Sequence, residues 1–258
     1  MGTLNGKKAL ITGSSRGIGR AIALAFAKEG ADIAVHYRRQ DEAARNVAEE
    51  VRGLGRQAIV VKADVENLEE VDAMFDQVRD SWGRLDAFVA NAAATAFKPV
   101  AELKGYHLDR TFHVIVHSVL RSAQRCLDLM HDGGRIITIS SLGGEFTLPR
   151  YANIGSAKAA LNSLTRYIAA EFGPHKITCN AISPGVVDTD SAEFYASENY
   201  KLFQDDVIKK TPLGRLAKPD DVADTALFLA GDASRFITGQ IIRVDGGLTL
   251  AGNGFEHA

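Results

Sequence analysis

The sequence predicts one doubly wound α/β domain, with a seven-stranded parallel sheet and helices on both faces. Three observations lead to this prediction. Short apolar segments alternate along the chain with longer segments of helical periodicity. The short segments are continuously apolar, as expected for strands covered on both faces. No linker, low-complexity tract or internal repeat interrupts the alternation, so residues 1–258 are interpreted as a single domain.

The expected strands are mostly rich in Val and Ile and have ordinary strand lengths. They cover residues 9–12, 33–37, 58–63, 87–91, 136–140, 177–182 and 241–244. Helical spacing is found at 18–29, 41–54, 68–82, 103–130, 156–172 and 220–229. Strict alternation implies right-handed crossover connections, which place helices on both faces of the sheet.

The segment 190–212 departs from this alternation and carries several aromatic side chains after the sixth strand. They are Phe194, Tyr195, Tyr200 and Phe203. Lids over substrate sites often lie in long excursions after the carboxyl end of a strand. We therefore predict a substrate lid here, with Phe194 and Tyr195 among the substrate-binding residues. An ordinary pair of surface helices is the alternative.

Composition narrows the range of partners. The formal net charge is −2, with no basic stripe for nucleic acid and no polybasic patch for an anionic membrane, so a small molecule is expected. Cys126 and Cys179 fall in a helix and a strand and are expected to be buried thiols in a reducing compartment. No apolar run has the length of a membrane span and no signal peptide precedes the first strand, so cytoplasm is the expected location.

A glycine-rich turn leads from the first strand into a helix. It reads Thr12, Gly13, Ser14, Ser15, Arg16, Gly17, Ile18 and Gly19. Glycines there permit a tight turn, close backbone approach to a pyrophosphate and close packing of helix on strand. The N–H groups at the helix start then face the anion. This context favours dinucleotide binding; the spacing is not GxGxxG, and a simple turn is the alternative.

The end of the second strand indicates which dinucleotide is bound. An NAD site usually has Asp or Glu there for the ribose 2′-hydroxyl, whereas this chain has Arg38 and Arg39. Together with Arg16, these guanidinium groups suit a 2′-phosphate. Solvated surface charge is the alternative, and Asp41 lies nearby in the sequence. We therefore expect NADPH in preference to NADH.

Further motifs follow in order along the chain. They are Ala63-Asp64-Val65, Asn91-Ala92-Ala93, Ser140-Ser141, Pro184-Gly185 with Thr189, Gly214-Arg215 and Val244-Asp245-Gly246-Gly247. With the glycine-rich turn, they make the chain resemble the short-chain dehydrogenase/reductase family over essentially its full length, with a Rossmann-type fold. The resemblance implies these cofactor contacts: Asp64 and Val65 to adenine, Asn91 and Ala92 to the ribose region, Val187 and Thr189 to the nicotinamide side, with Pro184 and Gly185 also in the site.

The catalytic signature departs from the usual pattern of that family. Most members carry Tyr four residues before the active-site Lys, but here Ile154 stands four residues before Lys158. Tyr151 stands seven residues before it, a spacing similar to that of the bacterial enoyl-acyl-carrier-protein reductases. The surrounding residues resemble most the third class of those enzymes. Ala93, where the wider family usually has Gly, agrees with that class and is expected to contact substrate.

The longer spacing suits one reaction better than another. Three residues of helix displace a side chain by roughly 4 to 5 Å along the axis. Conjugate reduction puts hydride on the β-carbon, while the oxyanion develops on the thioester carbonyl further along the substrate. A phenol set back from the nicotinamide suits this case, with Tyr151 binding substrate and stabilising an enolate. Lys158 is expected to hold the nicotinamide ribose, and Ser141, or alternatively Ser140, completes the catalytic set.

Other polar residues receive weaker interpretations. Ile115 stands where many family members have an Asn for a proton-relay water, which an apolar side chain cannot bond. His113 and His117 lack the Glu of a zinc-protease motif and are interpreted as surface or interface residues, so no metal site is expected. Basic residues near the lid could meet an acidic carrier protein or only solvate the surface: Lys201, Lys209, Lys210 and Arg215.

Three functions follow from these observations. The preferred one is an NADPH-dependent enoyl thioester reductase, acting on an acyl-carrier-protein or coenzyme A substrate as in fatty acid biosynthesis. The second is a 3-oxoacyl thioester reductase or another carbonyl reductase or alcohol dehydrogenase. The third is an NADP(H)-binding protein without turnover. The family resemblance also implies a homotetramer built through the long fourth and fifth helices and the C-terminal strand.

Overall fold

The computed structural model describes residues 2–93, 96–196 and 200–253. Within these residues one sheet of seven parallel strands has the order β3-β2-β1-β4-β5-β6-β7. The strands are β1 (Lys8–Ile11), β2 (Asp32–Tyr37), β3 (Ala58–Lys62), β4 (Ala87–Ala90), β5 (Gly134–Ile139), β6 (Ile177–Pro184) and β7 (Ile241–Val244). The predicted fold class and parallel sheet are therefore confirmed.

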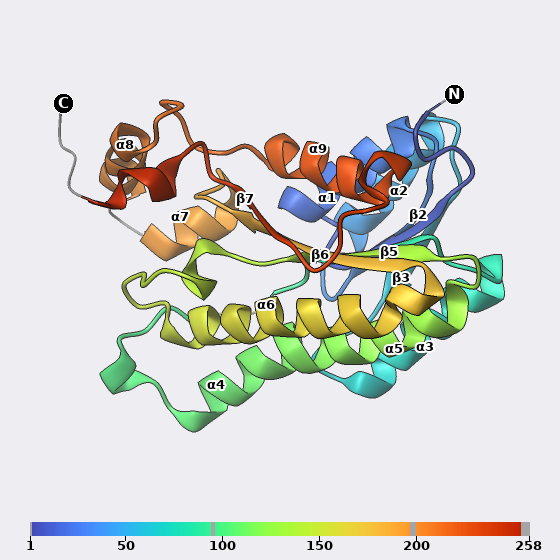
Figure 1. The fold of residues 1–258 in the computed structure, drawn as a ribbon, viewed down its shortest axis with the longest axis horizontal. Coiled ribbons are helices and arrows are strands. Elements are labelled where there is room, and N and C mark those ends of the chain that lie inside the picture. The colour runs from blue at the N-terminus through green and yellow to red at the C-terminus, as the bar shows by residue number, and fades with distance from the viewer. Residues whose placement is uncertain (1, 94–95, 197–199, 254–258) are drawn as a thin grey trace.

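Helices cover both faces of the sheet, as Figure 1 shows. One layer contains α1 (Gly17–Lys28), α2 (Asp41–Gly53) and α9 (Pro219–Ala230). The other contains α3 (Leu68–Trp82), α4 (Gly105–Phe112), α5 (Ser118–Leu129) and α6 (Ala152–Phe172). The short helices α7 (Asp190–Ala196) and α8 (Tyr200–Lys210) lie at one end, beyond the carboxyl ends of the central strands.

Each helical layer encloses its own apolar core. Because side chains of a strand alternate between faces, Ala9 and Ile11 of β1 join the cluster with α1, α2 and α9. Leu10 joins the cluster with α3, α5 and α6. This two-sided burial explains why the strands read as continuously apolar in the sequence.

The predicted helix over 103–130 is wrong in its middle. The chain forms α4, then a π-helical turn at His113–His117, then α5. Such a turn shifts the hydrogen-bonding pattern from the fourth to the fifth residue along the helix. Apolar periodicity does not reveal this local change, so the sequence predicted one uninterrupted helix.

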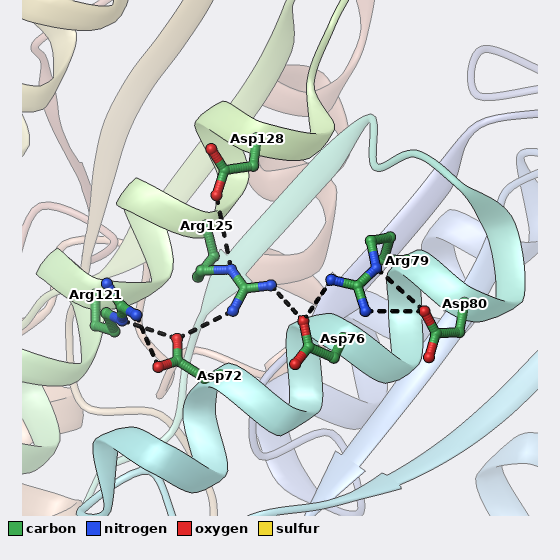
Figure 2. A network of polar contacts seen from close by, with 7 residues as sticks. All are labelled: Asp72, Asp76, Arg79, Asp80, Arg121, Arg125 and Asp128. Atoms are coloured by element: carbon green, nitrogen blue, oxygen red, sulfur yellow. Dashed lines mark hydrogen bonds and ion pairs between the residues drawn. The ribbon is translucent and has the colours of Figure 1, made fainter.

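Ion pairs join α3 to α5 along the edge of the second layer (Figure 2). Arg121 of α5 contacts Asp72 at 2.7 Å. Arg125 contacts Asp72 at 3.2 Å and Asp76 at 2.6 Å, and only 14% of its side chain is exposed. The remaining links are Arg79 to Asp76, Arg79 to Asp80 and Arg125 to Asp128. These contacts fix the polar edges of two helices that share an apolar core.

The strand order determines where a ligand can bind. β2 and β3 lie on one side of β1, whereas β4 to β7 lie on the other. In open parallel sheets, ligands bind beyond the carboxyl ends of the strands at this point of reversal. The loops that follow β1, β2, β4, β5 and β6 carry most of the predicted site residues. In the described part of the chain, every helix is too short or too polar to span a bilayer.

Candidate active site

The glycine-rich loop between β1 and α1 adopts a conformation that suits dinucleotide binding. Gly13 and Gly17 have φ angles of 66° and 56°, in the left-handed region that side chains disfavour. A Cβ atom on Gly19 would lie 2.4 Å from the Gly13 carbonyl oxygen, so α1 approaches the loop too closely for a side chain. The other loop residues differ in exposure: Ser14 is buried, Ser15 and Ile18 are half-buried, and Arg16 is exposed.

His36, near the end of β2, supports this loop, and the sequence analysis missed it. Its Nδ1 accepts the Gly13 N–H at 2.9 Å, so Nε2 carries the proton and donates to the Ala63 carbonyl at 3.0 Å. Ser14 Oγ accepts the His36 N–H at 3.0 Å and donates to the Ile11 carbonyl at 2.8 Å. Burial lowers the pKa of His36 to about 4, so the ring is neutral at pH 7. The sequence feature that could have revealed this role is a histidine within an otherwise apolar strand, because a buried polar side chain needs hydrogen-bond partners.

Thr12 and Asn91 join the loop to the end of β4. The Thr12 hydroxyl oxygen accepts the N–H groups of Asn91 at 2.9 Å and of Ala92 at 3.0 Å. Asn91 Nδ2 donates to the carbonyl oxygens of Thr12 at 2.9 Å and Gly13 at 3.2 Å. These hydrogen bonds join the ends of β1 and β4 at the point where the strand order reverses. Ala93 is exposed beside them.

The predicted 2′-phosphate arginines lie at the end of β2. Arg38 is half-buried and its Nη1 lies 3.4 Å from Asp64 Oδ2. Arg39 is exposed. Arg16 pairs with Asp190 at 2.9 Å across the mouth of the loop, and both side chains are exposed. Val65, which follows Asp64, is buried at 7% exposure.

Asp41, the residue that complicated the prediction of cofactor, has other partners. It accepts a hydrogen bond from Arg45 Nε at 2.7 Å and one from the Tyr37 hydroxyl at 2.5 Å. Arg45, and then Tyr37, lower the pKa of this carboxyl. Because both of its oxygens are engaged within α2 and β2, Asp41 does not replace the Asp or Glu of an NAD site.

The end of β6 lies on the other side of the candidate dinucleotide site from the end of β2. Pro184 is buried as the last residue of β6, and Gly185 donates its N–H to the Val244 carbonyl at 2.9 Å. A Cβ atom on Gly185 would lie 2.9 Å from the backbone of Asp245. Val187 is buried. Thr189 lies next to the glycine-rich loop, since a Cβ on Gly17 would be 3.9 Å from its methyl group.

Tyr151 and Ser141 are in contact, although ten residues separate them. Their hydroxyl oxygens are 3.2 Å apart, and Ser141 Oγ also accepts the Gly143 N–H at 3.2 Å. Burial raises the pKa of Tyr151, and the hydrogen bond to Ser141 offsets part of this effect. Ser140 instead donates to Asn162 inside the core at 2.6 Å, so the structure favours Ser141 over Ser140 at the site.

Tyr151 precedes the first turn of α6 and is not helical. Its φ and ψ are −114° and 8°, and its carbonyl accepts the Gly155 N–H at 2.7 Å. The calculation of displacement along a helix therefore does not apply to it as stated. A Cβ atom on Gly143 would lie 2.5 Å from the Tyr151 ring, so this glycine allows the phenol to lie flat against the loop after β5.

Lys158 lies on α6 beneath this loop and is buried at 5% exposure. Its Nζ donates to the Ile139 carbonyl at the end of β5, at 2.5 Å. Burial lowers the pKa of Lys158 to about 8. The ammonium group is therefore held at the carboxyl edge of the sheet, where a cofactor ribose would lie.

Five rings from four segments form what we call the aromatic cluster: Phe97, Tyr151, Phe194, Tyr195 and Phe203. Phe97 stacks on Tyr151 with ring centroids 5.8 Å apart and an interplanar angle of 24°. Tyr195 meets Phe97 edge-on at 4.8 Å and Phe203 at 5.5 Å. The segment 190–212 thus contains the helix pair α7 and α8, and its rings pack against the candidate catalytic tyrosine. Residues 197–199 lie outside the described part.

The comparisons with known proteins agree with this geometry. The family model described as Enoyl-(Acyl carrier protein) reductase matches residues 13–249. The chain belongs to the short-chain dehydrogenase/reductase family. Among relatives of this reductase, the 1-cyclohexenylcarbonyl-CoA reductase of Streptomyces collinus is 43% identical over 241 residues, which are 93% of this chain and 86% of that protein.

Solved structures of the family superimpose closely on this reductase. The angucycline C-6 ketoreductase LanV with bound NADP has a TM-score of 0.89 and 36% identity, covering 96% of this chain and 98% of that one. A 7α-hydroxysteroid dehydrogenase complexed with NADH and 7-oxo glycochenodeoxycholic acid has a TM-score of 0.90 and 33% identity, covering 95% and 94%.

The two positions at which the sequence was interpreted as departing from the usual family pattern belong to the apolar core. Ile154 and Ile115 are 4% and 1% exposed and lie in the same cluster. Beside them, Asn153 Nδ2 donates to Thr111 Oγ1 at 3.0 Å and ties the first turn of α6 to α4. Asn153 Oδ1 is buried without a hydrogen-bond partner among the described residues. The sequence analysis did not single out Asn153.

The remaining candidates are not brought into the site. The rings of His113 and His117 are 4.5 Å apart on the π-helical turn, but the described residues contain no group of three metal-ligating side chains. Lys210 pairs with Asp206 at 2.7 Å, and Arg215 pairs with Asp221 at 2.6 Å. Lys201 and Lys209, the other two basic residues near the predicted lid, are exposed.

Proposed function

We propose that this reductase saturates the carbon–carbon double bond of enoyl thioesters with NADPH. The observation that carries the proposal is the position of Tyr151. Its phenol contacts Ser141 from a residue before the first turn of α6, while the usual tyrosine position is the buried Ile154. A donor placed there suits an oxygen that lies two carbons from the point of hydride addition.

The residues present fit a dinucleotide with a 2′-phosphate. Gly13 and Gly17 give the glycine-rich loop its left-handed backbone, and Gly19 lets α1 pack against the Gly13 carbonyl, so the free N–H groups at the start of α1 are available to a pyrophosphate. Arg38 and Arg39 stand where the 2′-phosphate would lie, and Asp41 is engaged elsewhere. The neighbour LanV, solved with NADP bound, supports this choice. The bound cofactor supplies the hydride.

The side chains of this protein then stabilise the substrate oxygen. Burial raises the pKa of Tyr151, so its phenol stays protonated at pH 7 and donates a hydrogen bond to the thioester carbonyl. When hydride reaches the β-carbon, negative charge develops on that oxygen and the bond strengthens. Ser141 orients the phenol, and Lys158 holds the ribose and adds positive potential nearby. A proton from solvent on the α-carbon completes the saturated thioester.

Two similarities support a thioester substrate. The matching model describes enoyl reductases, and the relative from Streptomyces collinus is described as a coenzyme A thioester reductase. Because that relative is described as acting on a coenzyme A thioester, we favour coenzyme A as the carrier and do not tie the protein to fatty acid biosynthesis. The cytoplasm remains the predicted location.

A direct assay separates the candidate functions. NADPH oxidation is measured with crotonyl thioester and with acetoacetyl thioester under the same conditions. We expect turnover with the enoyl substrate and little with the keto substrate. The reverse preference would assign a carbonyl reductase, which the similarity to the ketoreductase LanV makes the second candidate. Tight NADPH binding without consumption of either substrate would leave the third candidate, a cofactor-binding protein without turnover.

We also propose a homotetramer. A groove of about 690 Å³ lies between α5 and α6 and includes Leu120, Leu164 and Tyr167, of which Tyr167 is 65% exposed. A second copy packed helix to helix would cover this surface. Size-exclusion chromatography with light scattering should give a tetramer mass, and Tyr167→Glu should reduce it.

A further inference from the structure

We infer that the aromatic cluster selects acyl groups whose unsaturated ring is attached directly to the thioester carbonyl, and that Phe97 and Tyr195 make this selection. The inference rests on the proposed function and names its substrate class. It follows from where the rings lie relative to the phenol that binds the carbonyl oxygen.

The rings form a wall beside Tyr151. Phe97 stacks on the Tyr151 ring at 5.8 Å, and Tyr195 stands edge-on to both, 4.8 Å from Phe97 and 6.1 Å from Tyr151. Ring faces and edges attract another flat ring more than they attract a flexible chain, because the whole face makes contact without loss of side-chain rotation. A substrate ring that enters here therefore replaces contacts between the protein's rings by similar contacts between those rings and the substrate.

The distances also place an aromatic surface beside the Tyr151 phenol. Tyr151 donates to the carbonyl oxygen and is itself a member of the aromatic cluster, so the first ring surface begins within one ring separation of that oxygen. A ring bonded to the carbonyl carbon reaches this wall. A straight chain with the same number of carbons leads away from it after two or three bonds.

Tyr195 is held firmly in relation to Tyr151, which a specificity determinant requires. Its hydroxyl donates to the Pro149 carbonyl at 2.8 Å, and its own carbonyl accepts from Arg150 Nη2 at 2.7 Å. Arg150 has φ of 57°, an unfavourable value for a non-glycine residue that these contacts help to maintain. The segment before Tyr151 and helix α7 are therefore fixed to each other.

The test compares 1-cyclohexene-1-carbonyl thioester with trans-2-heptenoyl thioester, which has the same number of acyl carbons. We expect kcat/KM for the ring substrate to exceed that for the chain by about tenfold, equivalent to about 1.4 kcal/mol. Phe97→Leu and Tyr195→Leu should each reduce this ratio by about fivefold while NADPH affinity and Tm change little. Phe236→Leu, at a fully exposed ring outside the cluster, is the matched control and should leave the ratio unchanged.

Two outcomes would overturn the inference. One is equal kcat/KM for ring and chain in the unmodified protein. The other is a loss of activity in Phe97→Leu and Tyr195→Leu that is the same for both substrates, which would mean that the rings only pack the lid. If no enoyl thioester is reduced, the proposed function fails separately. In that event, affinity for non-reducible benzoyl and heptanoyl thioesters in the presence of NADP⁺ still decides the inference, and equal affinities would contradict it.

Discussion

The glycine-rich loop and the aromatic cluster are held by different kinds of contact. The loop depends on backbone conformation and backbone hydrogen bonds, including those to the buried His36. The cluster depends on side chains from four segments, and Phe194 within it is 65% exposed. A backbone-built site leaves few positions free to vary, whereas a side-chain-built wall changes with each substitution. Substrate choice can therefore diverge in this molecule while cofactor binding is retained.

The sharpest test of this division removes the Tyr151 hydroxyl. The Tyr151 ring belongs to the aromatic cluster, and its hydroxyl stabilises the substrate oxygen in the proposed reaction. Tyr151→Phe should lower kcat for an enoyl thioester by about 10²- to 10³-fold, the usual loss for one oxyanion donor. NADPH affinity should be unchanged, because the loop is untouched. Stopped-flow or steady-state kinetics with an NADPH fluorescence titration measure both quantities.

The matched control for that variant is Tyr167→Phe, at an exposed tyrosine of α6, the helix that Tyr151 precedes. It should retain full activity. Unchanged kcat in Tyr151→Phe would remove the phenol from the mechanism and with it the argument for enoyl reduction.

The opposite variant damages the loop and spares the cluster. In Gly19→Ala the new Cβ would lie 2.4 Å from the Gly13 carbonyl and 2.6 Å from Asn91 Nδ2, so the loop must move. We expect NADPH affinity to fall by about 10²-fold, measured by fluorescence titration, with the ratio of ring to chain substrates preserved at saturating cofactor. Gly53→Ala, where a Cβ meets nothing within 4 Å, should bind NADPH normally. Normal binding by Gly19→Ala would contradict the assignment of the loop.

A smaller effect is expected for the choice between the two dinucleotides. Replacing Arg38 and Arg39 by Ala removes charge-assisted hydrogen bonds to the 2′-phosphate and should weaken NADPH by about tenfold to a hundredfold. NADH should bind as before, since it lacks that phosphate. Dissociation constants for both cofactors measure the difference, and equal weakening would show that the two arginines act only through general charge.

A further test concerns the pH dependence of stability and the support that His36 gives to the glycine-rich loop. The folded-state pKa of His36 is about 4 and its ordinary value is 6.5, so the unfolded chain takes up a proton first as pH falls. The free energy of unfolding is therefore unaffected by His36 above pH 6.5 and decreases as the pH falls from 6.5 toward 4, by about 1.4 kcal/mol per pH unit. Urea unfolding at several pH values should show a shallower acid dependence in His36→Asn than in the exposed-site control His175→Asn. Identical slopes would mean that His36 does not titrate on unfolding.

The sheet and the order of its elements could be predicted from the sequence, because strands that are buried on both faces are apolar along their whole length. The glycine-rich loop was equally accessible, since positive φ and close approach both demand glycine at fixed places. The candidate catalytic residues came from the resemblance to the family and the spacing of Tyr151 and Lys158, and the structure brings Tyr151 and Ser141 to 3.2 Å.

Other features depend on contacts between distant segments, which local patterns do not contain. The sequence does not show that His36 bonds to Gly13, because this contact depends on how the glycine-rich loop packs against β2. Phe97 gave no signal because its importance comes from the rings of Tyr151, which precedes α6, and of Tyr195 in α7. The π-helical turn at His113–His117 differs from α-helix by one hydrogen-bond step, which apolar periodicity does not resolve.

The central place of β1 affects how the protein is made as well as what it binds. During synthesis β1 can pair with β2 as soon as residue 37 has emerged, but its other edge stays open until β4, which begins at Ala87, is available. An unpaired apolar edge is prone to join strands of other chains. The crevice for the dinucleotide also does not exist before β4 docks, so NADPH cannot assist the first third of the chain to fold. A chain truncated before residue 87 should therefore leave an apolar edge of β1 open to strands of other chains.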